Sequence, residues 1–109
     1  MSENQEKRII LVVDDAPENI DLLSGILKGR YKIKVALNGE KALKVVAKAA
    51  PDLILLDVRM PQIDGFEVCQ RLKQDEQTRD IPILFISALQ DVEERVRGFN
   101  VGGVDFITK

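Results

Sequence analysis

Five short apolar runs recur along the chain, and stretches with helical spacing separate them. The runs begin near Ile9, Tyr31, Leu53, Ile81 and Val104. Strands that alternate with helices in this way are typical of a parallel sheet with helices packed against it. The hydrophobic pattern therefore predicts a single α/β domain with five parallel strands and four intervening helices.

The composition of each run predicts its place in the sheet. Residues 9–13, 53–56 and 83–86 are continuously apolar, as in strands that are covered on both faces. Residues 31–35 and 104–108 include polar positions, which are typical of edge strands because charge there discourages pairing between sheets. This pattern fits a flavodoxin-like, doubly wound sheet with the strand order 2-1-3-4-5, an order that we take from known folds of this kind.

Residues with capping chemistry predict where the helices begin and end. Pro17 suits the first turn of a helix, and Gly29 is expected to end that helix in a left-handed conformation. Asn38 can cap the second helix. Asp64 and Glu67 stand three residues apart before an apolar run, which is a capping-box pattern.

Length and composition limit the classes of protein. The chain has 109 residues and a formal net charge of −2, and it shows no basic stripe that favours nucleic acid. It lacks both a long apolar stretch and a secretory signal, and Cys69 is its only cysteine. We therefore expect a cytoplasmic domain over residues 8–109, preceded by a disordered tail over residues 1–7, without a membrane segment. The expected fourth helix, residues 91–100, has a thin apolar stripe and is expected to be weakly held.

The absence of histidine narrows the chemistry further. It excludes a Ser-His-Asp triad, a Cys-His pair and any imidazole-ligated metal. Carboxylates, hydroxyls, amines or a hard cation must then carry any reaction.

Polar side chains follow the predicted strands at one edge of the sheet. Asp14 and Asp15 end the first strand, Asp57 ends the third, Ser87 the fourth and Lys109 the fifth. Ligands of open parallel sheets bind at this carboxyl edge, where the strand order reverses. Each residue alone is more often a cap or a solvated loop residue, so the prediction of a site depends on their joint placement.

Three converging carboxylates favour a bound cation. At ~4 Å and an effective dielectric of ~20, a pair of like charges costs on the order of 4 kcal/mol. Oxygen ligands with room for a phosphate oxygen suit Mg²⁺ better than Ca²⁺. A carboxylate can itself accept a phosphoryl group, and Asp57 is the natural acceptor because Asp14 and Asp15 are better placed to hold the ion.

These residues also carry a resemblance to a known family. The chain resembles the receiver domain of a bacterial two-component response regulator from about Arg8 to Lys109. The motifs are Val12-Val13-Asp14-Asp15, Leu55-Leu56-Asp57, Met60-Pro61, Asp64-Gly65, Ser87-Ala88 and Phe106-Ile107-Thr108-Lys109.

The resemblance implies a phosphorylation switch rather than an enzyme that acts on other substrates. Asp57 is expected to accept a phosphoryl group from a phosphohistidine on a histidine kinase or a histidine phosphotransfer protein. Asp15, Asp57 and the backbone carbonyl of Arg59 are expected to ligate Mg²⁺ directly. Asp14 is expected to act through water or to hold the geometry of the site.

The resemblance also assigns the remaining strand-end residues. Ser87 is expected to hydrogen-bond the phosphoryl oxygen, and Lys109 to pair with its charge. Phe106 is expected to turn inward and reshape the face around the fourth helix and the fifth strand, which then controls an output domain or partner. No direct contact with nucleic acid is expected of this domain.

The chain departs from the family pattern at three positions. The family's lysine is normally followed by proline and a fifth helix, whereas this chain stops at Lys109. We therefore expect a domain truncated after strand five, with one face of the sheet half bare and open to homodimerisation. Phe106 replaces the commoner tyrosine. Arg59, two residues after Asp57, is expected to alter the lifetime of the acyl phosphate.

Three other classes fit less well. A Mg²⁺-dependent phosphatase with an aspartyl nucleophile needs an acid where Arg59 stands. A nucleotide or flavin site needs a glycine-rich loop after the first strand, where Asp14 and Asp15 lie instead. A receiver-like module that is never phosphorylated is disfavoured by the complete set of acidic residues.

Overall fold

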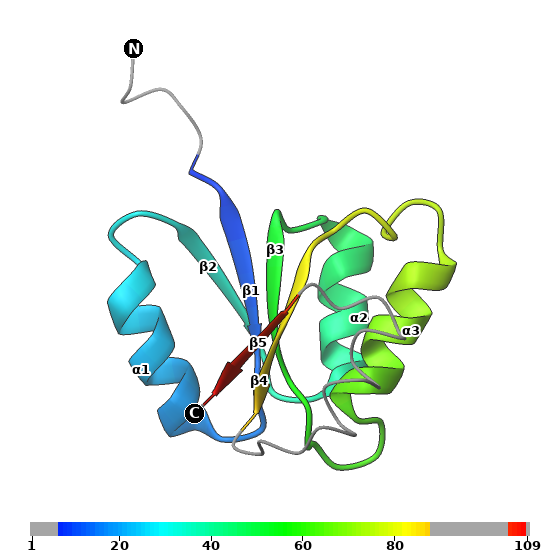
Figure 1. Ribbon diagram of the computed structural model, residues 1–109. Coiled ribbons are helices and arrows are strands. Elements are labelled where there is room, and N and C mark those ends of the chain that lie inside the picture. The colour runs from blue at the N-terminus through cyan, green and yellow to red at the C-terminus, as the bar shows by residue number, and fades with distance from the viewer. Residues whose placement is uncertain (1–6, 88–104, 109) are drawn as a thin grey trace.

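A parallel sheet with helices on both faces forms the molecule (Figure 1). The computed structural model describes residues 7–87 and 105–108, with residues 87 and 105–108 described by their backbone. The strands are β1 (Ile9–Val13), β2 (Lys32–Ala36), β3 (Leu53–Asp57), β4 (Ile83–Ser87) and β5 (Asp105–Thr108), and the helices are α1 (Pro17–Leu27), α2 (Gly39–Lys48) and α3 (Gly65–Gln74).

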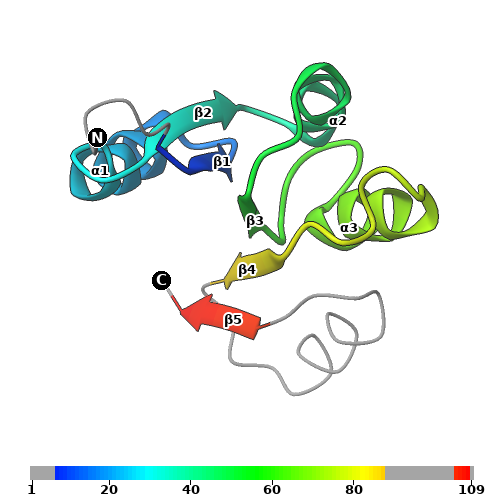
Figure 2. The ribbon, with the colours of Figure 1, turned by 90° about the horizontal axis from the view of Figure 1, so that it is seen from above.

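The arrangement confirms the flavodoxin-like α/β prediction for β2-β1-β3-β4 and the three helices. All neighbouring strands are parallel, and β5 pairs with β4 to give the order β2-β1-β3-β4-β5. Figure 2 shows α1 on one face of the sheet and α2 with α3 on the other. The fourth helix, expected at residues 91–100, and residues 1–6 of the expected tail lie outside the described residues.

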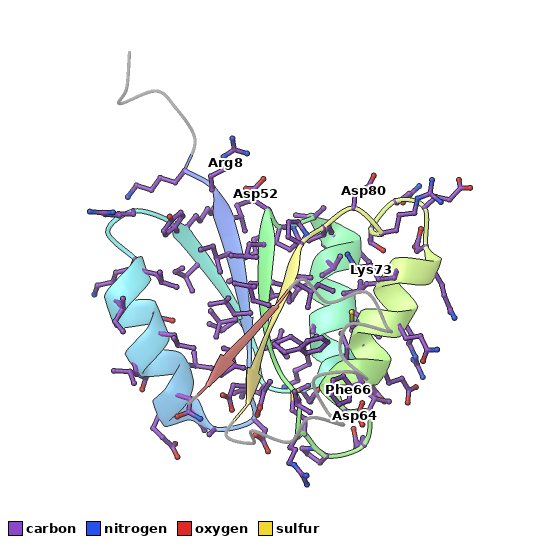
Figure 3. The ribbon with its side chains drawn as sticks, viewed as in Figure 1. Arg8, Asp52, Asp64, Phe66, Lys73 and Asp80 are labelled. Atoms are coloured by element: carbon purple, nitrogen blue, oxygen red, sulfur yellow. The ribbon has the colours of Figure 1, made fainter. Side chains whose placement is uncertain are left out.

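Two apolar cores hold the helices on the sheet. The larger core lies between the sheet and the α2–α3 layer, where the rings of Phe66 and Phe85 meet edge to face with their centroids 5.1 Å apart. Figure 3 shows Phe66 inside this layer, with Asp64 near it and Arg8, Asp52 and Asp80 at the opposite end of the strands. The smaller core, built on Ile10, Val12, Ile20, Leu55 and Ile86, holds α1.

The α1 face carries an apolar hollow beside that smaller core. Its volume is about 490 Å³. The residues that line it include Leu23, Leu27, Leu53, Leu55 and Leu84. Among the described residues, α1 is the one helix on this face of the sheet. The sequence led us to expect that this face is only partly covered by helices.

The predicted helix starts are confirmed. Pro17 occupies the first position of α1. The side chain of Asn38 accepts a hydrogen bond from the Lys41 N–H at 2.8 Å, and that of Asp64 accepts one from the Glu67 N–H at 2.9 Å. The first turn of a helix leaves backbone N–H groups without partners inside the helix. The carboxamide oxygen of Asn38 and the carboxylate oxygen of Asp64 each accept one of these N–H groups.

The predicted end of α1 is wrong. Gly29 does not adopt a left-handed conformation. Instead, the N–H groups of Arg30 and Tyr31 both donate to the carbonyl oxygen of Leu27 at 3.0 Å, and the Lys28 N–H donates to Ser24. These bonds satisfy the last carbonyls of the helix within an ordinary turn, so no left-handed residue is needed.

Candidate functional site

The sheet brings three aspartates together at the carboxyl ends of β1 and β3. Val13 lies opposite Leu56 in the parallel pairing of these strands, so the next residues, Asp14 and Asp57, follow side by side. Asp14, Asp15 and Asp57 each offer a carboxylate oxygen, and these oxygens lie within 4.8 Å of one another. The expected convergence of these side chains at one sheet edge is therefore present in the structure.

The three carboxylates differ in their exposure to water. Asp14 is completely buried and Asp57 is 4% exposed, whereas Asp15 is exposed. Buried carboxylates are costly unless donors or a cation compensate their charge. The group therefore has two anionic residues in the protein interior and one at the solvent boundary, which is an arrangement suited to holding a small cation that enters from water.

Backbone and side-chain donors fix the position of Asp14. Its N–H donates to the carbonyl of Ala36 at 3.2 Å, which extends the pairing of β1 with β2 by one residue. One carboxylate oxygen accepts from the Ala16 N–H at 2.9 Å, and the other accepts from the Asn19 side-chain amide at 3.1 Å. Sequence reasoning did not identify Asn19, because its only signal is its position in the first turn after the aspartate pair.

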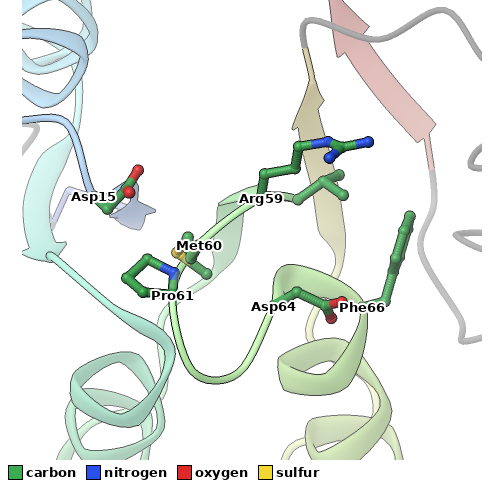
Figure 4. Close-up of a pocket in the computed structure, with 7 residues that line it drawn as sticks. Asp15, Arg59, Met60, Pro61, Asp64 and Phe66 are labelled. Carbon is green, nitrogen blue, oxygen red and sulfur yellow. The ribbon is translucent and has the colours of Figure 1, made fainter.

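A pocket opens beside the cluster, between β1 and the loop that joins β3 to α3. Its volume is about 560 Å³. Figure 4 labels six of its lining residues, which are Asp15, Arg59, Met60, Pro61, Asp64 and Phe66, and Val58 also lines it. The pocket is large enough to admit a phosphoryl-sized group beside Asp15, the one member of the cluster among its lining residues.

The β3–α3 loop returns tightly against the end of β3. The Gly65 N–H donates to the carbonyl of Val58 at 2.8 Å. A Cβ atom at position 65 would overlap the carbonyl oxygen of Asp57. Gln62 lies in the same loop with a φ of 71°, a left-handed conformation that costs energy for a residue other than glycine. The loop beside Asp57 therefore depends on glycine at position 65, a role that the sequence alone did not define.

Arg59 lies at the rim of the pocket and is exposed. In Figure 4 its guanidinium extends away from Asp15. The side chain therefore leaves the approach to Asp15 open, although its flexible stem keeps a positive charge near the same loop.

The other predicted site residues are defined in part. The backbone of Ser87 ends β4, one residue after Ile86, which lies opposite Asp57. Phe106 lies in β5, opposite Phe85. Both strands therefore run toward the edge that carries the carboxylates, whereas the side chains of Ser87 and Phe106 and all of Lys109 fall outside what the structure describes.

The carboxylate set fits a hard divalent cation. Oxygen ligands select Mg²⁺ or Ca²⁺ over softer metals, and Mg²⁺ typically takes one or two carboxylates together with water and phosphate oxygens. Two of the three carboxylates are buried, so a bound cation would offset negative charge that water reaches poorly. Asp15 and Asp57 are the residues that would hold the ion directly, and Asp14, whose two oxygens accept hydrogen bonds from Ala16 and Asn19, would fix the geometry of the site.

The chain belongs to the family of response regulator receiver domains. The family's sequence profile matches residues 10–109, which is nearly the whole chain. This family regulates signalling in two-component systems, and the resemblance stated from the sequence motifs is confirmed.

Individual relatives agree with this membership. The chain is 43% identical to the DNA-binding dual master transcriptional regulator RpaA of Synechocystis over 92% of its length and 42% of the relative's. It is 46% identical to the response regulator PleD of Caulobacter vibrioides, over 92% of this chain and 22% of PleD. The chain thus spans less than half the length of these curated relatives.

A solved structure supports the fold. The N-terminal domain of a response regulator receiver protein from Methanoculleus marisnigri superposes with a TM-score of 0.86 at 38% identity, over 94% of this chain and 84% of that one. In the described part of our chain, no helix has the length and apolar character needed to cross a membrane.

Proposed function

We propose that this domain is a phosphorylation switch in which Asp57 accepts a phosphoryl group in a Mg²⁺-dependent reaction. The observation that carries the proposal is the convergence of three carboxylates within 4.8 Å, with Asp57 buried at the end of a central strand. Membership of the receiver domain family supports the same assignment.

The phosphoryl donor is a phosphohistidine on a histidine kinase or a histidine phosphotransfer protein. A carboxylate oxygen of Asp57 attacks phosphorus, and an O–P bond forms as the P–N bond breaks. The imidazole leaves with the electron pair and takes up a proton from solvent. The product is an acyl phosphate, which is a reactive and reversible modification.

Asp15, Asp57 and the backbone carbonyl of Arg59 hold Mg²⁺ in this proposal, and Asp14 acts through water or fixes the geometry. The bound cation supplies positive charge that offsets the carboxylates and the phosphoryl oxygens. Because phosphoryl transfer depends mostly on positioning and charge neutralisation, residues that orient Asp15 and Asp57 govern the rate.

Three residues respond to the phosphoryl group on Asp57. Ser87 hydrogen-bonds a phosphoryl oxygen, and Lys109 pairs with the added charge. Phe106 then turns inward and changes the face around β5 and the fourth helix that the sequence predicts over residues 91–100. A local change in charge thereby biases a structural element that has two arrangements.

The output of the switch resides in a partner or another domain. The curated relatives are more than twice as long as the matched region, and one of them is described as DNA-binding. We propose that any contact with DNA belongs to such a further domain, and that the protein acts in the cytoplasm. Self-association through the apolar hollow beside α1 is part of the same proposal, and sedimentation velocity at several concentrations tests it.

Acetyl phosphate tests the chemistry without a known kinase. Incubation with acetyl phosphate and Mg²⁺ is expected to give a phosphorylated protein whose modification is removed by hydroxylamine, and Asp57→Asn is expected to give none. Turnover of phosphomonoesters by the wild type would instead indicate a phosphatase. A wild-type protein that gains no adduct with Mg²⁺ present would contradict the proposal.

A further inference from the structure

A side chain outside the carboxylate cluster contacts it directly. Asn19 lies in the first turn of α1, five residues after Asp14, and its amide nitrogen donates to one oxygen of the Asp14 carboxylate at 3.1 Å. The Ala16 N–H occupies the other oxygen at 2.9 Å. Each of the two carboxylate oxygens of Asp14 therefore accepts a hydrogen bond from a donor at the start of α1.

Asp14 has a strong need for these donors. Its side chain is completely buried. One of its carboxylate oxygens lies within 4.8 Å of a carboxylate oxygen of Asp15 and of one of Asp57. A buried carboxylate without donors is costly, and like charges at this separation repel one another. Because the Asp14 side chain is completely buried, donors within the protein take the place of water, and Ala16 and Asn19 are two of these donors.

The amide of Asn19 is suited to this position because it is neutral. A lysine or arginine there would also donate to Asp14, but its positive charge would compete with a cation for the cluster. The amide supplies a hydrogen bond and leaves the charge of the three carboxylates unchanged. It therefore orients one carboxylate without reducing the attraction of the cluster for a divalent ion.

We propose that Asn19 is a positioning residue for the cation site: by holding the Oδ2 atom of Asp14, it keeps the carboxylate cluster in the arrangement that binds Mg²⁺. This inference rests on the proposed function, because it concerns the same site. Residues that surround a metal site commonly set metal affinity by fixing its geometry, and Asn19 would do so through Asp14, which lies beside the direct ligands.

A structural role in α1 alone is the alternative explanation. The residue before α1, Ala16, has no side chain able to cap the helix. The Asp14 carboxylate instead accepts the Ala16 N–H, and loss of Asn19 could simply loosen the start of the helix. The two explanations differ in whether Mg²⁺ affinity changes more than a comparable loss of helix stability would predict.

Calorimetric titration with Mg²⁺ separates the two explanations when a second asparagine serves as the control. Asn38 caps α2 by accepting a hydrogen bond from the Lys41 N–H with its side-chain oxygen, and it contacts none of the three aspartates in the interactions described. Asn19→Leu removes the amide and keeps good helix propensity, and Asn19→Ala removes the side chain. Asn38→Ala weakens the start of α2 without removing a donor to any of the three aspartates in the interactions described.

We expect both Asn19 variants to bind Mg²⁺ about tenfold more weakly than the wild type. Asn38→Ala is expected to melt about 5 °C lower while keeping the wild-type affinity for Mg²⁺. Asn19→Gln, which retains an amide, is expected to recover part of the lost affinity.

Wild-type affinity in both Asn19→Leu and Asn19→Ala would overturn the role of Asn19 and leave the proposed phosphorylation switch intact. An equal loss of affinity in Asn38→Ala would also overturn it, since the effect would then follow helix stability. A wild-type protein that binds no Mg²⁺ would instead contradict the metal site on which the proposed function depends.

Discussion

Gly65 lies against the backbone of Asp57 so closely that a Cβ atom at position 65 would overlap the Asp57 carbonyl oxygen. The same glycine begins α3 and donates its N–H to Val58. The backbone of the proposed phosphoacceptor and the start of α3 are therefore in direct contact. Any movement of the β3–α3 loop must be accommodated at this contact.

Gly65→Ala is expected to destabilise the domain by about 1–3 kcal/mol, the usual cost of forcing extra atoms into a packed site. Because the displaced atoms belong to Asp57 and Val58, the variant is also expected to accept a phosphoryl group more slowly. Denaturant unfolding and the rate of adduct formation with acetyl phosphate measure the two effects.

Gly25→Ala is the matched control for this substitution. Gly25 lies within α1, and a Cβ there meets nothing within 4 Å. Alanine in a helix is favoured over glycine by about 0.5–1 kcal/mol, so this variant is expected to be more stable than the wild type. Equal stability of the two variants would contradict the close contact at position 65.

Asp15→Asn is expected to change stability in opposite senses with and without Mg²⁺. Without the ion, removing one charge relieves repulsion from the two buried aspartates, so the melting temperature rises. With the ion, the affinity for Mg²⁺ falls about tenfold or more, and the stabilisation that binding gives the wild type is reduced accordingly. Thermal melts over a series of Mg²⁺ concentrations measure both effects.

Asp80→Asn removes the same charge from an exposed loop at the opposite end of the strands (Figure 3). It is expected to leave the Mg²⁺ dependence of the melting temperature unchanged. If it shifted that dependence as much as Asp15→Asn does, the effect would come from overall charge rather than from ligation.

Arg59→Ala is expected to shorten the lifetime of the acyl phosphate. The guanidinium is exposed at the rim of the pocket, and its positive charge is expected to act on the phosphoryl oxygens of the proposed adduct. Exposed charge interactions of ~0.5–1 kcal/mol correspond to a change of about two- to fivefold in the rate of hydrolysis. Equal dephosphorylation rates for the wild type and the variant, measured after removal of acetyl phosphate, would refute this expectation.

Cys69 is expected to be unreactive in the folded protein. Burial raises the pKa of its thiol from the ordinary 9.0 to about 11, against a smaller opposing effect of Lys73. The thiolate is the form that attacks thiol reagents, so labelling at pH 8 is expected to be slow in buffer and fast in guanidinium chloride. Fast labelling of the folded protein at that pH would contradict the buried position of Cys69.

The same shift predicts a loss of stability in alkali. The folded protein keeps the Cys69 proton more tightly than the unfolded chain does, so this contribution is complete below about pH 9 and is lost as the pH rises toward about 11. Cys69→Ala is expected to lose less stability than the wild type across this range. Parallel alkaline unfolding curves for the two proteins would contradict the pKa shift.

The sequence predicted those features that depend on periodicity and strand ends. Apolar runs identify the central strands, and the geometry of a parallel sheet requires Asp14 and Asp57 to meet at one edge. Asn38 and Asp64 could be identified as caps because capping depends on residues only three positions apart.

Features that depend on tertiary contacts could not be predicted. The contact of Gly65 with Asp57 depends on the path of the whole β3–α3 loop. The bond from Asn19 to Asp14 depends on the angle at which α1 leaves β1. Gly29 fits a common helix-ending pattern, but hydrogen bonds to Leu27 end α1 without it.

The most direct test of the central claim is to locate the phosphoryl group. After reaction with acetyl phosphate and Mg²⁺, borohydride reduction converts a phosphorylated aspartate to homoserine, which peptide mass spectrometry identifies. We predict homoserine at position 57 in the wild type, with none after chelation of Mg²⁺ or at position 57 of Asp57→Asn. Modification confined to another residue, or an equal yield at position 57 without Mg²⁺, would contradict the account.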